Sequence, residues 1–247
     1  MFFIPLFLSN LRTQKIGRRI EYLKSTDSTN QTIFRFFKNQ KMKDGNVLIT
    51  DEQKSGKGRR GNHWFSSSEK SLTFSLLIEN SDKLLNKKLP LVCGIAIVKA
   101  IKEIADIDCN LKWPNDVLYD SRKIAGVLIE QKQNHFIVGV GINVNNTKFP
   151  KSIEKKASSL ELILDYPIKR EVLLAKIFNH LEKLLSNDIK DIIIEWESFC
   201  NHLGISVKFH DFNDMVNGQF IGLNQNGDAK IDFNGEEMVI NSGIIEI

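Results

Sequence analysis

Two segments of this sequence combine cations, amides and glycines in a way that suits a phosphorylated ligand. The first, Gln53–Trp64, has the sequence QKSGKGRRGNHW, and the second, Lys112–Glu130, contains KWPND followed by RKIAGVLIE. Lysine and arginine form charge-assisted hydrogen bonds with phosphate oxygens, and glycine tolerates large backbone rearrangements. Together the segments predict a site at which a phosphorylated ligand binds and negative charge develops.

The glycine pattern of the first segment does not fit the common nucleotide folds. Gly56–Gly61 matches G-x-G-x-x-G, but a dinucleotide-binding motif requires a helix after it, and Asn62–Ser68 is a poor helix start. The HRD and DFG motifs that accompany the glycine loop of a protein kinase are missing. There is also no G-x-x-x-x-G-K-[ST] sequence, so a P-loop is excluded.

A cationic lid over a ligand is the interpretation that remains for this loop. Lys57, Arg59 and Arg60 would bind phosphate or carboxylate oxygens. Trp64 offers an aromatic face on which a base could stack. The alternative is a solvated basic loop, but Gln53 and Trp64 at its two ends, together with the second segment, favour the lid.

Neutral polar residues form a third group upstream of the loop. Ser28, Thr29 and Asn30 stand where a helix begins, so at least one of them is expected to cap that helix. Capping is compatible with ligand binding, because a helix N-terminus also presents free N–H groups. With Gln53, these side chains supply both donors and acceptors and therefore suit a neutral ligand head better than a phosphate.

The second segment places charged and amide side chains around a strand. Pro114 fixes a turn after the strand at 110–113 and could aim Asn115 and Asp116 into a cleft, although both residue types are also common in simple turns. Lys123 stands at the mouth of an otherwise apolar strand, where a lone lysine is usually solvated. Gly126 on this strand, and Gly139 and Gly141 on the neighbouring one, have no side chains, which could leave a slot for a slender apolar chain.

Composition and charge limit the classes of protein to which this chain could belong. The chain has 247 residues, 42% apolar and 26% charged, with a net charge of +4, which fits one large domain and one small domain but not a general nucleic-acid binder. The apolar run 1–8 is too short for a signal peptide and is expected to be a strand or arm packed on the body. The three cysteines, Cys93, Cys109 and Cys200, have no zinc or disulfide spacing, which predicts a reduced, cytoplasmic protein with no membrane span.

The order of expected elements predicts an α+β fold. Strands are expected at 20–24, 47–50, 72–78, 110–113, 123–130 and 135–144, and helices from 27–30 onward and at 91–105, 171–185 and 189–200. Hairpins adjacent to helices favour a mixed, partly antiparallel sheet. Short β segments follow, with turns at 211–214, 224–228 and 234–235. We expect a first domain at 1–203, with an arm at 1–19, and a small β-barrel domain at 204–247.

At these motifs the chain resembles the biotin–protein ligases, in family order, from about Ile20 to its end. The matching pieces are Ser28–Asn30, Gln53–Trp64, Lys112–Asp116, Arg122–Gly126 and Gly141–Asn143. The resemblance implies a catalytic domain related to class II aminoacyl-tRNA synthetases and a C-terminal SH3-like domain. It also implies the monofunctional type, since the DNA-binding domain of the bifunctional members has no counterpart here.

The resemblance assigns expected roles to individual residues. Biotin contacts are expected from Ser28, Thr29, Asn30, Gln53, Lys57, Gly58, Arg59, Lys123 and Gly126. Nucleotide contacts, or supports for them, are expected from Arg60, Trp64, Lys112, Asn115 and Asn143. Lys123, Arg59 and Asp116 are the expected catalytic residues, with Asp116 deprotonating or orienting the acceptor lysine. Lys57 replaces the usual arginine and loses its planar, bidentate geometry, and the chain ends where some members carry a basic residue near ATP.

The implied reaction joins biotin to a lysine of the biotin carboxyl carrier protein of acetyl-CoA carboxylase or another carboxylase. ATP is consumed, magnesium is carried mainly by its phosphates rather than by a protein metal site, and biotinyl-5′-AMP is the intermediate. No nucleic-acid partner is expected, and a homodimer could form through a free sheet edge. One alternative is a lipoate or octanoate ligase or transferase. Octanoyltransferases use a cysteine nucleophile, which these motifs lack, and the polar set Ser28, Thr29, Asn30 and Gln53 favours a ureido ring over the dithiolane of lipoate. The other alternative is a non-catalytic regulator that binds biotinyl-AMP.

Overall fold

A seven-stranded mixed sheet forms the centre of the structure, a computed structural model that describes residues 1–210 and 215–246. Its strands lie in the order β1 (Ile20–Thr26), β2 (Val47–Gln53), β3 (Leu72–Glu79), β7 (His135–Ile142), β6 (Arg122–Lys132), β5 (Asp116–Tyr119) and β4 (Asn110–Lys112). Only β1 and β2 are parallel, and each of the other neighbouring pairs is antiparallel. The predicted mixed α+β fold is confirmed.

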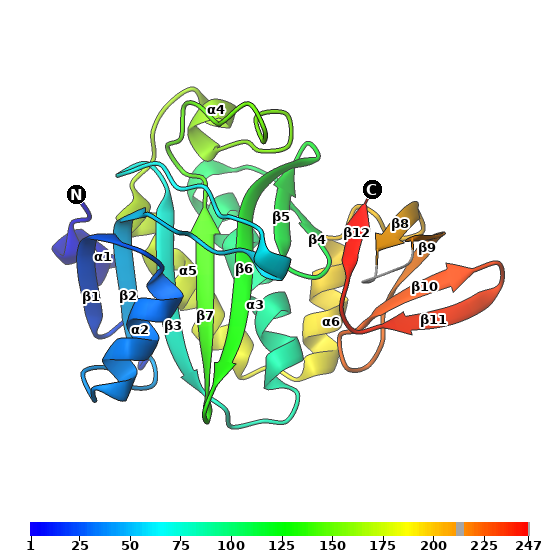
Figure 1. Ribbon diagram of the computed structural model, residues 1–247, viewed down its shortest axis with the longest axis horizontal. Coiled ribbons are helices and arrows are strands. Elements are labelled where there is room, and N and C mark those ends of the chain that lie inside the picture. The colour runs from blue at the N-terminus through cyan, green and yellow to red at the C-terminus, as the bar shows by residue number, and fades with distance from the viewer. Residues whose placement is uncertain (211–214, 247) are drawn as a thin grey trace.

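Helices cover both faces of this sheet (Figure 1). On one face lie α3 (Leu85–Ala105) and α5 (Arg170–Leu185), with α1 (Ile4–Asn10) against α5 and α6 (Ile189–Ser198) against α3. On the other face α2 (Thr29–Lys38) packs against β2, β3 and β7. The short helix α4 (Leu160–Leu164) begins beside the residues that follow β7, because the Leu160 N–H donates to the Asn143 carbonyl at 3.2 Å. Within the described ranges, no helix has the length and apolar character needed to cross a bilayer.

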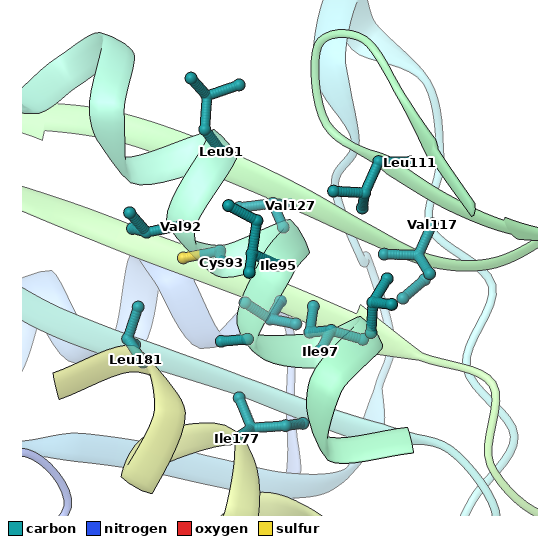
Figure 2. Close-up of a cluster of buried hydrophobic side chains, with 14 of the residues drawn as sticks. Leu91, Val92, Cys93, Ile95, Ile97, Leu111, Val117, Val127, Ile177 and Leu181 are labelled. Carbon is teal, nitrogen blue, oxygen red and sulfur yellow. The ribbon is translucent and has the colours of Figure 1, made fainter. Parts of the chain in front are cut away.

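The main core lies between α3 and the sheet, and Figure 2 shows part of it. Leu91 and Ile95 of α3 are essentially buried, and Val127 of β6 points toward them. Because side chains alternate along a strand, Gly126, the neighbour of Val127, faces the opposite side, where α2 lies. The apolar packing of β6 on α3 therefore fixes the strand whose other face borders the candidate site.

The second sheet is antiparallel and has the order β11 (Glu236–Ile240), β10 (Ala229–Phe233), β9 (Met215–Leu223), β8 (Ser206–His210) and β12 (Ile244–Glu246). The turns predicted at 224–228 and 234–235 are present, and the one predicted at 211–214 lies outside the described residues. Among the described strands, β11 and β12 are the two ends of this order, and the small antiparallel sheet agrees with the predicted all-β C-terminal part. The Lys87 Nζ of α3 lies 2.6 Å from Asp228 Oδ1, and the Trp113 Nε1–H donates to the Gly227 carbonyl at 3.2 Å. These contacts hold the turn between β9 and β10 against α3 and the turn after β4.

Three sequence expectations need correction. The run 1–8 contains the start of helix α1, so the strand alternative is wrong. The arm is packed on the body, as expected, since Phe7 is fully buried. Its ring meets the Phe178 ring edge to face, with 5.9 Å between the ring centroids. Helix α3 begins at Leu85 rather than at 91 and continues through Pro90, because burial of its first turns stabilises them. Strand β5 was not predicted, because its four residues follow a turn directly and are too few to show a clear alternating pattern.

A buried ion pair connects the central sheet to α5. Asp51 of β2 and Arg170 at the start of α5 are 1% and 5% exposed, and their atoms Oδ1 and Nη2 are 2.9 Å apart. Arg170 also donates to the Ser71 carbonyl at 2.9 Å, and the Tyr22 hydroxyl donates to Asp51. Both charges are therefore satisfied by partners, as burial requires.

Replacing Arg170 with alanine should destabilise the fold strongly, because it leaves the Asp51 carboxylate buried without its cation. Removing one partner of a buried pair typically costs about 3–5 kcal/mol. Urea denaturation of both proteins measures the loss, with Arg35→Ala on the exposed side of α2 as the matched control. If the two variants lost the same stability, the Asp51–Arg170 pair would not have the role assigned to it.

Candidate active site

One cavity of about 190 Å³ lies on the α2 side of the sheet. Residues of the N-terminus of α2, the loop after β2, the strands β5–β7 and the start of β12 line it. The predicted site residues that line it are Ser28, Thr29, Asn30, Gln53, Lys57, Gly58, Arg59, Arg60, Trp64, Lys112, Asn115, Asp116, Lys123 and Gly126. The structure thus brings together residues that are up to about a hundred positions apart in the sequence.

The loop after β2 is folded as a short hairpin over the sheet. The Gly58 N–H donates to the Asn62 carbonyl at 2.7 Å, and the Trp64 N–H donates to the Gly56 carbonyl at 2.9 Å. Arg60 lies at its tip with φ of 53°, a left-handed conformation that suits a tight turn. This hairpin carries the three cations of the loop as one unit.

Arg59 connects the hairpin to two other parts of the chain. Its Nη1 lies 3.3 Å from Oδ1 of Asn115 and 3.4 Å from the carbonyl of Gly243, which precedes β12. Burial, followed by repulsion from Arg60, lowers the pKa of the Arg59 guanidinium, while Asp116 opposes this shift. Burial thus makes the positive charge of Arg59 costly, and a bound anion would reduce that cost by pairing with it.

Lys123 of β6 and Asp116 of β5 form an ion pair inside the cavity. The Lys123 Nζ lies 2.6 Å from Asp116 Oδ1 and 5.7 Å from the centre of the Trp64 ring. Burial lowers the pKa of Lys112 on β4, and Asp116 opposes this effect while Lys123 adds to it. The described lining residues include five lysines and arginines and one carboxylate, Asp116, so this end of the cavity attracts anions.

The opposite end of the cavity is polar but neutral. Gln53 Oε1 accepts hydrogen bonds from the Thr29 N–H at 2.8 Å and the Thr29 hydroxyl at 3.0 Å. Ser28 occupies the N-cap position of α2, yet its side chain makes no capping bond, so the predicted side-chain cap is wrong. Gln53 takes this role because the end of β2 lies directly beside the helix start.

The glycines predicted to form a slot accommodate protein side chains in this structure. A Cβ on Gly141 would lie 2.2 Å from Cε2 of Trp64, and a Cβ on Gly126 would lie 2.9 Å from Cε of Lys123. The Trp64 ring therefore occupies the space over Gly141, where the apolar chain of a ligand was expected. Its Nε1 is buried and has no hydrogen-bond partner among the described residues.

Asn143 is the predicted site residue that does not line the cavity. It is buried, and its Nδ2 donates to the Lys123 carbonyl at 3.3 Å, while its N–H donates to the Ile124 carbonyl at 2.8 Å. It therefore holds the start of β6, which fits the predicted supporting role. The residues 243–245 line the cavity without having been predicted, because no motif distinguishes them in the sequence.

A second cavity of about 200 Å³ adjoins the first at the turn after β4. Arg59 and Asn115 line both cavities, and Leu91, Val127 and Ile129 give the second one apolar walls. A ligand with a charged centre and a flat apolar end could therefore extend from one cavity into the other.

Comparisons with known proteins agree with this geometry. Residues 22–145 match the model of the biotin/lipoate A/B protein ligase family. The structure of biotin protein ligase from Aquifex aeolicus in complex with biotin and ATP superposes with a TM-score of 0.82 at 32% identity, covering 93% of this chain and 98% of that one. The biotin–[acetyl-CoA-carboxylase] ligase of Mycobacterium tuberculosis is 26% identical, over 97% of this chain and 94% of its own. The bifunctional ligase/repressor BirA of Bacillus subtilis is 27% identical, over 96% and 76% respectively.

Proposed function

This chain belongs to the biotin/lipoate A/B protein ligase family, and from that premise we propose that it ligates biotin to a carrier-protein lysine at the expense of ATP. The observation that carries the proposal is the polarity of the cavity, which is neutral at Thr29 and Gln53 and cationic around Lys123. Biotin has the same polarity, with a neutral ureido ring at one end and a carboxylate at the other.

The first step is adenylation of biotin. Hydroxyls and amides at the α2 end satisfy the ureido donors and carbonyl without burying a charge, and they disfavour acids that leave these groups unpaired. The biotin carboxylate oxygen attacks the ATP α-phosphorus, the bond to the β-phosphate breaks, and pyrophosphate leaves. Lys123 and Arg59 offset the negative charge that increases on the α-phosphate oxygens in the transition state.

The nucleotide and its metal ion fit the remaining features. The cavity beside Asn115 offers apolar walls to a base. Within the described residues no group of three or more His, Cys, Asp or Glu is placed to hold a metal, and Asp116 is already paired with Lys123. This donor set fits magnesium that arrives on the ATP phosphates, as is common for this ion; when bound it neutralises phosphate charge.

The second step transfers the biotinyl group. The amine of the acceptor lysine attacks the acyl carbon of biotinyl-5′-AMP, a C–N bond forms, and AMP leaves. The hairpin at 56–64 shields the mixed anhydride from water until then. We propose the biotin carboxyl carrier protein of acetyl-CoA carboxylase, or of another carboxylase, as the acceptor, supported by the name of the Mycobacterium tuberculosis relative.

Replacing Asp116 with alanine should slow this transfer step. We expect a loss of about 10²-fold or more, the usual contribution of a general base, because Asp116 is the only carboxylate among the described residues that line the cavity. The measurement starts from isolated biotinyl-AMP and carrier protein, so that adenylation does not contribute. Asp120→Ala, at an exposed turn on the same hairpin, is the control. Unchanged transfer in Asp116→Ala would remove the proposed role.

A lipoate or octanoate ligase or transferase and a non-catalytic regulator are less well supported. Cys93, Cys109 and Cys200 are absent from the described lining, so the cavity offers no cysteine nucleophile to an acyltransferase. A regulator that only binds biotinyl-AMP would not release pyrophosphate. Biotin-dependent release of pyrophosphate by the purified chain therefore tests the proposed function against both alternatives.

We also propose the remaining organisation on the basis of the sequence and the family. The catalytic domain is taken as 1–203 and the C-terminal domain as 204–247. A homodimer would form through a free edge of the large sheet, whose two edge strands are β1 and β4. A cytoplasmic location without a nucleic-acid partner is supported by the three free cysteines and the mild net charge of +4.

A further inference from the structure

Asn30, in the first turn of α2, is held from two strands at once. It is 3% exposed and borders the neutral end of the cavity. Its Oδ1 accepts a hydrogen bond from the hydroxyl of Ser75 on β3 at 2.5 Å, and its Nδ2 donates to Oε2 of Glu130 on β6 at 2.7 Å. No motif in the sequence connects these three residues.

The strand between β3 and β6 makes this arrangement possible. In the sheet register Gly139 of β7 pairs with Ser75 on one side and with Leu128 on the other. A Cβ on Gly139 would lie 2.3 Å from Oδ1 of Asn30. Asn30 therefore occupies the space over Gly139 where a side chain would otherwise lie. From there it links β3 to β6, the two strands on either side of β7.

The chemistry of Glu130 determines which way the Asn30 amide points. An ionised carboxylate only accepts hydrogen bonds, so the amide nitrogen of Asn30 must face Glu130 and its oxygen must face Ser75. Asn30 keeps one N–H and one oxygen lone pair beyond these two bonds. With both ends of the amide held, the remaining donor and acceptor have fixed positions.

Glu130 also completes the charge gradient along the cavity. Its carboxylate lies behind the neutral end, whereas Lys123 and the loop cations lie at the other end. An acid that entered with its carboxylate toward α2 would be repelled there and attracted at Lys123. Both effects favour the same orientation of a ligand with one neutral and one anionic end.

We propose that Glu130 is a positioning residue for biotin: through Asn30 it fixes the hydrogen-bonding groups that receive the ureido ring. This inference rests on the proposed function and adds a residue outside the cavity lining to it. Glu130 acts on the binding of the neutral ring and not on the reacting carboxylate or on ATP.

The first test is steady-state pyrophosphate exchange by Glu130→Leu and Glu130→Gln. The leucine variant should raise KM for biotin about tenfold, which corresponds to about 1.4 kcal/mol, while kcat and KM for ATP stay close to the parent values. The glutamine variant should restore most of the affinity, because its Oε1 still accepts from Asn30. Glu79→Leu, on the exposed end of β3, is the control for replacing a strand glutamate.

A double-mutant cycle decides whether Glu130 acts through Asn30. In an Asn30→Ala background, Glu130→Leu should cause no further rise in KM for biotin. An equal rise in both backgrounds, or an unchanged KM in a folded Glu130→Leu protein, would overturn the inference. If circular dichroism shows that Glu130→Leu does not fold, Ser75→Ala and Gly139→Ala supply the test, since each should raise KM for biotin by disturbing Asn30; unchanged values would overturn it. A parent protein without biotin-dependent exchange would instead refute the proposed function.

Discussion

Replacing Lys123 with methionine is expected to lower kcat/KM for biotin-dependent pyrophosphate exchange by about 10²–10³-fold, the usual effect of removing one group that stabilises transition-state charge. The Lys123 Nζ is positioned by Asp116 at 2.6 Å, at the cationic end of the cavity. Methionine keeps much of the length and the apolar stem but removes the positive charge and the three donors. The loss should appear with saturating ATP.

A matched variant on the same strand separates charge from packing. Lys132→Met, at the far end of β6, removes an identical charge outside the cavity and should leave exchange near the parent rate. Lys123→Arg keeps the charge with a different geometry and should recover part of the activity. A decrease of less than about tenfold, or 1.4 kcal/mol, in folded Lys123→Met would show that this lysine does not stabilise the reacting phosphate.

Replacing Arg59 with glycine should release biotinyl-5′-AMP prematurely. Arg59 links the hairpin to Asn115 and to the carbonyl of Gly243, so its loss frees the hairpin from both. Charged hydrogen bonds contribute about 1.5–3 kcal/mol, which corresponds to a release rate roughly 10–100-fold higher. The escaped anhydride should then label lysines of unrelated proteins.

Two measurements detect the premature release of biotinyl-5′-AMP. The first is the half-life of the intermediate on the enzyme after rapid gel filtration, and the second is biotin incorporation into serum albumin in the same mixture. Arg18→Gly, at an exposed position before β1, is the control. An Arg59→Gly protein that retains the intermediate as long as the parent would contradict the lid function of the hairpin.

Charged and amide residues in short segments that also contain glycine or proline could be predicted as site residues from the sequence. Lys123 and Asn115 stand beside strand ends and line the cavity as predicted. Glu130 was not predicted, because its contact with Asn30 depends on the order of β3, β7 and β6, which no local pattern encodes. The position of Trp64 against Gly141 was missed for the same reason, since it depends on how the loop folds back over the sheet.

The elements of the fold were predictable where their periodicity is long. The hairpin of β6 and β7 and the buried helix α3 have enough residues for a clear pattern. The short strand β5 has only four residues, and α1 depends on packing against α5, so neither is evident locally. Tertiary contacts also decide the cap of α2, where Gln53 takes the place of a serine side chain.

The central claim is that this cavity activates biotin, and exchange of labelled pyrophosphate into ATP tests it most directly. The assay is run with the purified chain and with biotin, lipoate or octanoate as the acid. We predict exchange with biotin and little or none with the other two, because only biotin satisfies the neutral end of the cavity. Exchange with lipoate or octanoate but not with biotin, or no exchange with any of the three, would contradict the proposed function.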